Sequence, residues 1–420
     1  MTNFNNSKSL YLSFIVAIMV TYLIPPYAIA DRIGNHWIYL STILLIITGF
    51  FQINRINIFK IEKESNETKY ILWAYTSFIL ISTFSLFVAE NKVESLVVIS
   101  QQLTVFISFL ILLKISSVFQ EYQKTMFGVL YVFLIIELIF SSTPLIIDLS
   151  NNVMRMRSND YVGLMSNINI TSFSILYKLP VILYFYEKNK LKAAKVFNLI
   201  ILSISFLTII AIGSRASYLA IIACLIFYVL YKIFLDKRKS IKKILALTFT
   251  LIATIFFSII LSNKSNSQTA IDRVATINFN NIDGSTQQRI NYYKSSFEIF
   301  KKHPIFGIGI GNWKYKSIEY NRFNLNGYIV PFVTHNDFLQ VLNETGLFGF
   351  ISYLLIFIFI MYSFLKRKND KNLFFVILFM IIYVIDSLLN FPLVRTTSQI
   401  QFIIFLSIFF HSYKLSGAKE

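Results

Sequence analysis

The sequence predicts an all-α, polytopic membrane protein, and three observations support this class. Hydrophobic residues make up 55% of the 420-residue chain and charged residues only 14%, whereas an ordinary soluble domain has about 25% charged residues. The mean hydropathy is +0.62, and apolar runs long enough to cross a hydrocarbon core of about 30 Å recur along the whole chain. The segments of alternating hydrophobicity that mark outer-membrane barrels are absent.

The apolar runs predict about twelve transmembrane helices in a single integral membrane domain, residues 1–420. The predicted spans are Leu10–Ala30, Trp37–Ile53, Ile71–Val88, Leu96–Ile115, Thr125–Ile147, Ile168–Tyr186, Val196–Ile212, Tyr218–Phe234, Ile244–Leu261, Leu347–Leu365, Leu373–Leu389 and Ile400–Tyr413.

The charge of the connections predicts the orientation of these spans. Alternate connections are basic, as at Glu187–Lys195, Leu235–Lys243 and Lys366–Lys371. Because Lys and Arg gather in cytoplasmic loops, both termini are expected in the cytoplasm. The first run ends in Ala28-Ile29-Ala30, like a signal-peptide cleavage site, but its length and Pro25-Pro26 favour a retained span.

The net charge of +18 is then mostly a feature of membrane topology. No basic face is interleaved with base-stacking aromatic residues, so a nucleic-acid partner is not expected, whereas membrane lipid is. The single cysteine, Cys224, lies within a span and excludes an internal disulfide.

One connection, residues 262–345 between the ninth and tenth spans, is much longer than the others and is expected to face the periplasm and carry much of the active site. Within it, Thr286–Pro304 repeats its apolar residues at helical spacing, which predicts a helix on the membrane surface with Arg289 near its start. The glycines of Phe306–Trp313 follow no predicted strand, so they indicate a flexible or closely packed backbone rather than a nucleotide loop.

A histidine stands at the end of this connection, in Val333–Gly349, VTHNDFLQVLNETGLFG. Thr334 is predicted as the N-cap of a short helix, with Asp337 as its capping partner and Gly346 at its end. His335 would then lie in the first helical turn and face an apolar layer. An isolated histidine in this position would most simply be a structural residue.

Several arginines lie on the same predicted side of the membrane. Arg215, in AIGSRASYL, stands at a tight turn between two spans at membrane depth. A charge there is a functional-site hypothesis by default, the alternative being an anchor that reaches to water. Arg155 and Arg157 lie in the loop Asn151–Asn169 and could also be solvated loop charges.

The motifs that are missing restrict the chemistry. The predicted outer loops contain no D-x-D pair, no His/Cys cluster with zinc spacing and no G-x-S-x-G serine. Reactions on this side would have to use arginines as fixed cations and a histidine as proton acceptor, so no metal or other cofactor is expected. The planar guanidinium suits a phosphate group.

This pattern resembles the O-antigen ligase and polymerase superfamily of bacterial membrane glycosyltransferases, which have a GT-C-like helical fold. The topology carries the resemblance over nearly the whole chain. The matching segments are Ser214-Arg215, Arg289 followed by Lys302–Trp313, His335–Gly349, which is similar to H-N-x-x-L-x-x-x-x-E-x-G-x-x-G, and Gly163–Thr171. Two further segments, Asp31–Ser41 and Asn390–Arg395, resemble those of Bacteroidetes-type members.

The resemblance implies transfer of a glycan from an undecaprenyl-diphosphate carrier to an acceptor hydroxyl, without metal, at the periplasmic face of the inner membrane. It implies that Arg215 and Arg289 grip the diphosphate and that His335 activates the hydroxyl. The acceptor stays open among a glycolipid such as lipid A-core, a growing glycan and a protein. Further residues expected to line the site are Asn336, Glu344, Arg155, Arg157, Asn169 and Arg395.

The alternative is a polytopic transporter or flippase of lipid-linked glycans. Transporters commonly carry repeats and charges near the bilayer midplane. Here the two halves are unlike, and only Glu137 and Lys178 lie deep within predicted spans. The sequence therefore favours a transferase.

Overall fold

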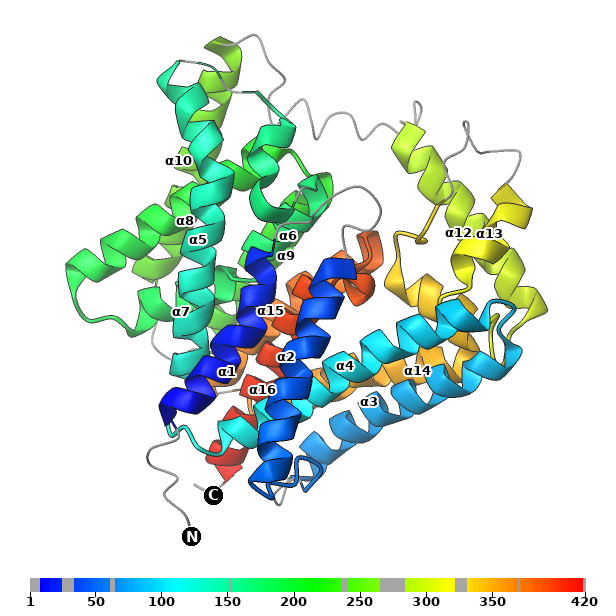
Figure 1. Ribbon diagram of the computed structural model, residues 1–420. Coiled ribbons are helices and arrows are strands. Elements are labelled where there is room, and N and C mark those ends of the chain that lie inside the picture. The colour runs from blue at the N-terminus through cyan, green and yellow to red at the C-terminus, as the bar shows by residue number, and fades with distance from the viewer. Residues whose placement is uncertain are drawn as a thin grey trace.

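The computed structural model describes residues 8–24, 34–60, 65–151, 153, 155–165, 167–235, 241–264, 284–321, 331–368 and 370–417, and all regular secondary structure in these residues is helical (Figure 1). The α-helices are α1 (Lys8–Val20), α2 (Gly34–Ile53), α3 (Asn66–Phe84), α4 (Lys92–Ser116), α5 (Tyr122–Ser150), α6 (Ile168–Leu176), α7 (Leu179–Lys188), α8 (Lys192–Ile212), α9 (Arg215–Phe234), α10 (Ile241–Lys264), α12 (Gly284–Lys302), α13 (Trp313–Asn321), α14 (Asp337–Lys366), α15 (Lys371–Leu389) and α16 (Thr396–Gly417). Short 3₁₀ helices are η2 (Thr21–Leu23), η3 (Ser85–Val88), η4 (Asn159–Met165) and η5 (Pro392–Val394).

The prediction of an all-α polytopic membrane protein is confirmed. Ten helical stretches in the described residues are long and apolar enough to cross a membrane. The first predicted span is represented by a shorter apolar helix, Lys8–Leu23, while Pro25-Pro26 and Ala28–Ala30 lie outside the described residues. The last, α16, is not among the ten. It begins with the polar sequence TTSQIQ and is buried along most of its length.

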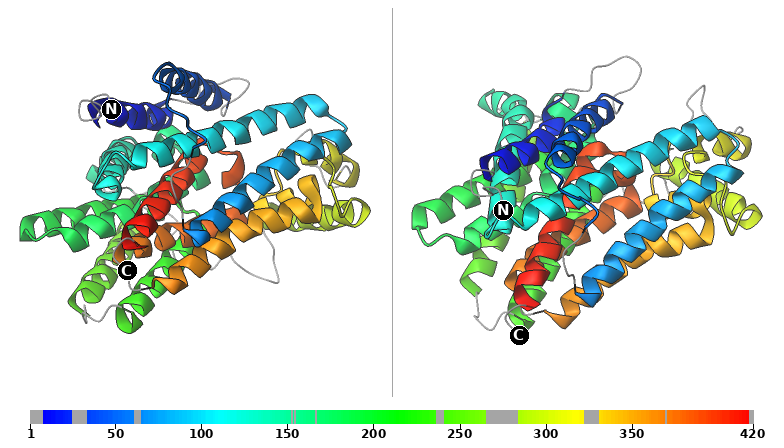
Figure 2. Two further views of the ribbon diagram at one scale, coloured as in Figure 1. Left: turned by 90° about the horizontal axis from the view of Figure 1, so that it is seen from below. Right: turned by 60° about the horizontal axis from the view of Figure 1, so that its bottom comes forward.

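The helices form a bundle around α15 and α16. Phe379 of α15 stacks on Phe405 of α16 with ring centroids 4.0 Å apart, and α15 also packs against α9 and α14. Helices α1 and α2 cover one face of the bundle, and α3 runs beside α14 (Figure 2). The start of α1 and the end of α16 lie at one end, whereas α12 and α13 lie at the far end of α3 and α14 (Figure 1).

The two charges that the sequence places deep within spans pair with each other. Lys178 Nζ lies 2.8 Å from Glu137 Oε2, and the side chains are 0% and 3% exposed. Lys178 stands where the sixth predicted span breaks into α6 and α7, and its ammonium also donates to the Ser174 carbonyl and hydroxyl. Because a buried charge is tolerated when it is paired and hydrogen-bonded, this pair is accounted for by the fold.

The glycine segment between α12 and α13 fixes these two helices to the bundle. Gly307, Gly309 and Gly311 all have positive φ. The amides of Ile308 and Gly309 donate to the carbonyls of Asn343 and Glu344 in α14, at 2.9 and 3.0 Å. A Cβ on Gly309 would lie 2.4 Å from the Cβ of Ala89. Close approach of backbones, one of the two expected reasons for these glycines, is therefore confirmed.

Gly309→Ala is expected to destabilise the protein, because it combines a backbone at φ +93° with a steric clash against Ala89. A non-glycine residue in such a conformation costs about 1–3 kcal/mol before the clash is counted. Thermal unfolding in detergent should show a midpoint several degrees below wild type. Gly128→Ala in α5, where no atom lies within 4 Å of the added Cβ, is the control. Equal midpoints for the two variants would contradict this account of the glycine segment.

Candidate active site

His335 lies just before α14, not within its first turn. Helix α14 is capped by Asn336, whose Oδ1 accepts a hydrogen bond from the Leu339 amide at 3.1 Å. Thr334 forms a tight turn instead, since its hydroxyl donates to the Asn336 carbonyl at 2.6 Å and accepts from the Asn336 amide at 3.1 Å. The prediction of Thr334 as N-cap was therefore wrong. His335 has φ +57°, a conformation that non-glycine residues rarely adopt.

Aromatic side chains surround the imidazole of His335. The ring of Tyr292 in α12 is nearly parallel to it, with centroids 6.4 Å apart. The ring of Phe391, between α15 and η5, meets it at 75° and 5.2 Å. Tyr293 donates its hydroxyl hydrogen to the backbone carbonyl of His335 at 3.3 Å. Imidazole Nδ1 is buried and has no hydrogen-bond partner among the described residues.

This environment favours the neutral imidazole. Burial, and to a lesser extent the positive charges of Arg289 and Arg395, together lower the pKa of His335 from 6.5 to about 4. A neutral histidine can accept a proton, which is what a general base requires. The neutral form of His335 is therefore favoured by burial and by two nearby cations.

Two of the predicted arginines lie near the start of α12. Arg215, the first residue of α9, follows Gly213 in a left-handed turn, so the predicted tight turn is confirmed. Its Nη2 lies 3.5 Å from Thr286 Oγ1 in the first turn of α12. One turn further along, Arg289 Nη1 donates to the Leu389 carbonyl at the end of α15, at 2.9 Å. The start of α12 therefore lies over the ends of both α9 and α15.

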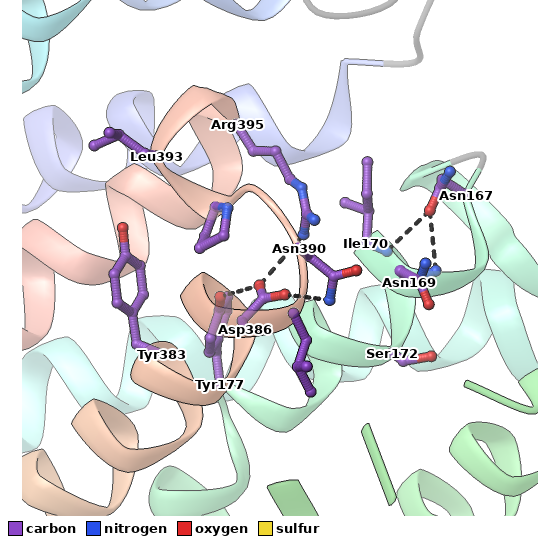
Figure 3. A network of polar contacts seen from close by, with 12 residues as sticks. Asn167, Asn169, Ile170, Ser172, Tyr177, Tyr383, Asp386, Asn390, Leu393 and Arg395 are labelled. Atoms are coloured by element: carbon purple, nitrogen blue, oxygen red, sulfur yellow. Dashed lines mark hydrogen bonds and ion pairs between the residues drawn. The ribbon is translucent and has the colours of Figure 1, made fainter. Parts of the chain in front are cut away.

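Arg395 belongs to a buried polar network at the end of α15 (Figure 3). Its Nη1 lies 3.3 Å from Asp386 Oδ2, and its guanidinium carbon lies 4.2 Å from the centroid of the Phe391 ring. Asp386 also accepts hydrogen bonds from the Tyr177 hydroxyl and from Asn390 Nδ2. Arg395 Nε and Nη2 are buried without a partner among the described residues. The carboxylate offsets the charge of Arg395, while the N–H groups on these two nitrogen atoms remain available to a ligand.

Two of the further residues expected to line the site flank the turn that carries Arg215. Asn169 Oδ1, at the start of α6, accepts a hydrogen bond from the Ser214 hydroxyl at 2.8 Å, and this end of α6 lies near the network of Arg395 (Figure 3). The Arg157 amide donates to the Ala211 carbonyl at 2.9 Å. The Cγ atom of Arg157 lies so close to Gly213 that a Cβ added to this glycine would be 2.8 Å from it.

Three other predicted site residues have structural partners. Arg155 forms ion pairs with Asp148 and Asp160, both at 2.9 Å. Glu344 is buried and accepts hydrogen bonds from the Trp313 amide at 3.2 Å and from Gln340 Nε2 at 3.3 Å, which holds the glycine segment in place. The Asn336 side chain caps α14. In the described part of the chain no three His, Cys, Asp or Glu side chains are grouped so as to hold a metal ion.

Residues of this region that the sequence did not indicate are Asp386, Tyr177, Tyr292 and Phe391. Asp386 is a lone acidic residue in the apolar run Leu373–Leu389, and such a residue within a span is a signal that could have found it. The aromatic residues carry no comparable signal, because the chain contains 24 tyrosines and 43 phenylalanines.

Comparison with known proteins links this region to one family. Residues 200–354, which include Arg215, Arg289 and His335, match the family model described as O-antigen ligase. An uncharacterized protein of Haemophilus influenzae is 26% identical over 213 residues, which cover 49% of this chain and 51% of that protein. The match therefore spans about half the length of the curated relative.

The proton affinity of His335 can be measured directly. Only four histidines are present, so ring-carbon NMR of labelled protein, with His335→Gln to identify the signal, can follow its titration. Because the pKa is lowered to about 4, the ring should stay neutral as the pH falls from 8 to 5 and gain its proton only near pH 4. A midpoint between pH 6 and 7 would contradict the burial described above.

Proposed function

We propose, from the premise that this chain belongs to the O-antigen ligase and polymerase superfamily, that it is a membrane glycosyltransferase. In this proposal the donor is a glycan linked to undecaprenyl diphosphate, and the acceptor is a hydroxyl group of a glycolipid, a growing glycan or a protein. The observation that carries the proposal is the meeting of Arg215, Arg289 and a neutral His335 around the first turns of α12.

The reaction replaces one bond to the anomeric carbon of the glycan by another. The acceptor oxygen attacks that carbon, the bond to the carrier diphosphate breaks, and the diphosphate leaves with the bonding electrons. The hydroxyl proton passes to His335. Negative charge grows on the leaving diphosphate, and fixed cations stabilise that charge better than mobile water does. Arg215 and Arg289 supply the cations, and their planar groups can each bind two phosphate oxygens.

Donor binding is expected to prepare the histidine for its role. In the structure the charges of Arg289 and Arg395 lower the pKa of His335. A bound diphosphate would offset this positive charge and raise the pKa, so the imidazole becomes a stronger base when the substrate is present. Arg395, whose Nε and Nη2 atoms are buried without partners among the described residues, is positioned to serve as a third cation.

The location of the site suits a lipid-linked donor. Arg215 lies at the start of α9, Leu389 at the end of α15 and His335 just before α14, and all three helices are apolar enough to span a membrane. A carrier lipid could thus keep its chain in the bilayer while its diphosphate reaches the arginines. We place the protein in the bacterial inner membrane, with both termini in the cytoplasm and this site on the periplasmic side.

The proposed reaction requires no metal, because the arginines take the part that a divalent cation would take on the diphosphate. Purified protein in detergent should transfer glycan from undecaprenyl diphosphate to one of the three acceptor classes, and EDTA should leave the rate unchanged. Detergent removes any compartment to transport into, so product formation excludes a transporter. A reversible loss of activity in EDTA would assign the role of the arginines to a metal.

Arg215→Lys and Arg289→Lys are each expected to lose most of kcat/KM, because lysine keeps the charge but not the two-pronged geometry. Arg155→Lys is the control, since its partners are Asp148 and Asp160 and its loss of geometry should affect the rate little. The same assay measures all three. Comparable losses in all three variants would indicate a general effect of outer arginines rather than a specific diphosphate site.

His335→Gln is expected to lower kcat by about 10²–10⁴-fold, the usual contribution of a general base. The donor KM should change little, because the arginines hold the diphosphate. The matched control is Glu344→Gln, whose amide oxygen can still accept from the Trp313 amide. An active His335→Gln enzyme together with an inactive Glu344→Gln enzyme would move the base to Glu344.

A further inference from the structure

Within the described part of the chain, no hydrogen bond to Nδ1 fixes the imidazole of His335. In many enzymes the second ring nitrogen of a catalytic histidine donates to a carboxylate or a carbonyl, which fixes the ring. Here the buried Nδ1 has no partner among the described residues, and Tyr293 bonds to the backbone carbonyl instead of the ring. The orientation of the ring must therefore come from packing.

Two aromatic rings supply that packing from opposite elements. Tyr292 of α12 lies nearly parallel to the imidazole, at 11° and 6.4 Å. Phe391 meets it edge-to-face, at 75° and 5.2 Å. The turn formed by Thr334 and Asn336 fixes the backbone of His335 at φ +57°. With the backbone set by the turn, rotation of the ring about its Cβ–Cγ bond is limited mainly by these two aromatic neighbours.

Phe391 also contacts a cation. The guanidinium carbon of Arg395 lies 4.2 Å from the centroid of the same ring, which is a cation–π contact. Arg395 also forms an ion pair with Asp386, with 3.3 Å between Nη1 and Oδ2. One aromatic ring thus contacts both the candidate base and a buried arginine that is itself anchored to α15.

We propose that Phe391 is a positioning residue: its ring orients the His335 imidazole for proton transfer, keeps water from it and sets its separation from Arg395. The role of Phe391 in the reaction rests on the proposed function, in which His335 accepts the acceptor proton. Its effect on the imidazole itself does not, because orientation and proton affinity are properties of the folded protein.

An aromatic ring suits both contacts, because its face attracts a cation while its edges and face also pack against imidazole. Leucine would fill part of the volume but could not form the cation–π contact, and it would admit water to His335. Among the described residues, the charged and titratable groups that act on or contact His335 are Arg289, Tyr292 and Tyr293 from α12 and Arg395 after η5. Asp386 is paired with Arg395, and Asp337 follows two residues later at the start of α14.

The substitution Phe391→Leu should change two measurable properties. The pKa of His335 should rise toward 6.5, since burial is the main cause of its decrease, and the acid limb of the pH–rate profile should move to higher pH. The value of kcat should fall about 10- to 100-fold through loss of orientation. The donor KM should stay within about twofold, because Arg215 and Arg289 hold the diphosphate and Asp386 still anchors Arg395. Phe391→Tyr keeps the ring and should retain both properties.

The control is Phe338→Leu. Phe338 lies in the first turn of α14, and its aromatic contacts in the described part of the chain are with Tyr353 and Phe357. Each variant is measured by thermal unfolding, by NMR titration of His335, and by kcat and KM over pH. Loss of activity shared by Phe391→Leu and Phe338→Leu, with equal falls in unfolding midpoint, would show that Phe391 only supports the fold.

Three further results bear on the proposed role of Phe391. A wild-type titration midpoint and a wild-type kcat in Phe391→Leu would overturn the proposal, and a change confined to KM would make Phe391 a donor-binding residue. If the wild-type protein transferred no glycan at all, the proposed function would fail. The NMR midpoint of Phe391→Leu would still show, in that case, whether Phe391 controls His335.

Discussion

The hydrogen bond from Arg289 to the Leu389 carbonyl is the contact on which the candidate site depends. The last carbonyl groups of a helix lack intrahelical partners and carry partial negative charge, so the end of α15 is a natural position for a guanidinium. This bond holds α12 across the ends of α9 and α15. One turn further along, Tyr292 and Tyr293 of the same helix contact the ring and the backbone of His335. Moving α12 would separate the arginines from the histidine.

The position of α12 is set at its other end by packing of backbones. The glycine segment after α12 lies against the α3–α4 connection and against α14, where side chains larger than hydrogen would clash. Glu344 and Asn312 satisfy the polar groups of this contact, through the Trp313 amide and the Ser95 hydroxyl respectively. Helix α12 is therefore attached at two places, by the steric fit of the glycine segment at one end and by the hydrogen bond of the charged Arg289 at the other.

Buried charge in this protein is compensated in two different ways. Lys178 and Glu137 satisfy each other within the spans, which is consistent with a role in the fold. Arg395 is only partly satisfied by Asp386, because its Nε and Nη2 atoms have no partner among the described residues. A buried polar group without a partner costs free energy unless a ligand completes it. The satisfied pair Lys178–Glu137 therefore supports the bundle, whereas the partly satisfied Arg395 suits an anionic substrate.

Much of this arrangement follows from local sequence patterns, and the rest depends on contacts distant in the chain. Apolar runs predicted the helical membrane class, and SR after a glycine predicted the turn at Arg215. The interpretation of Thr334 failed because Asn336 is an equally good cap two residues later, and only the turn geometry decides between them. The local sequence does not indicate that Arg155 pairs with Asp148 and Asp160. It also does not indicate that Glu344 accepts a hydrogen bond from the Trp313 amide. Phe391 became visible only once α12, α14 and η5 were brought together in space.

The most direct measurement of the central claim is the NMR titration of His335 with and without undecaprenyl diphosphate lacking a glycan, which can bind but cannot react. If the arginines hold the diphosphate beside the imidazole, its negative charge should raise the pKa of His335 above the value of about 4 in the free protein. Arg289→Lys should reduce this rise at equal lipid concentration. A pKa that stays the same while the lipid is shown to be bound would place the diphosphate elsewhere and contradict the account.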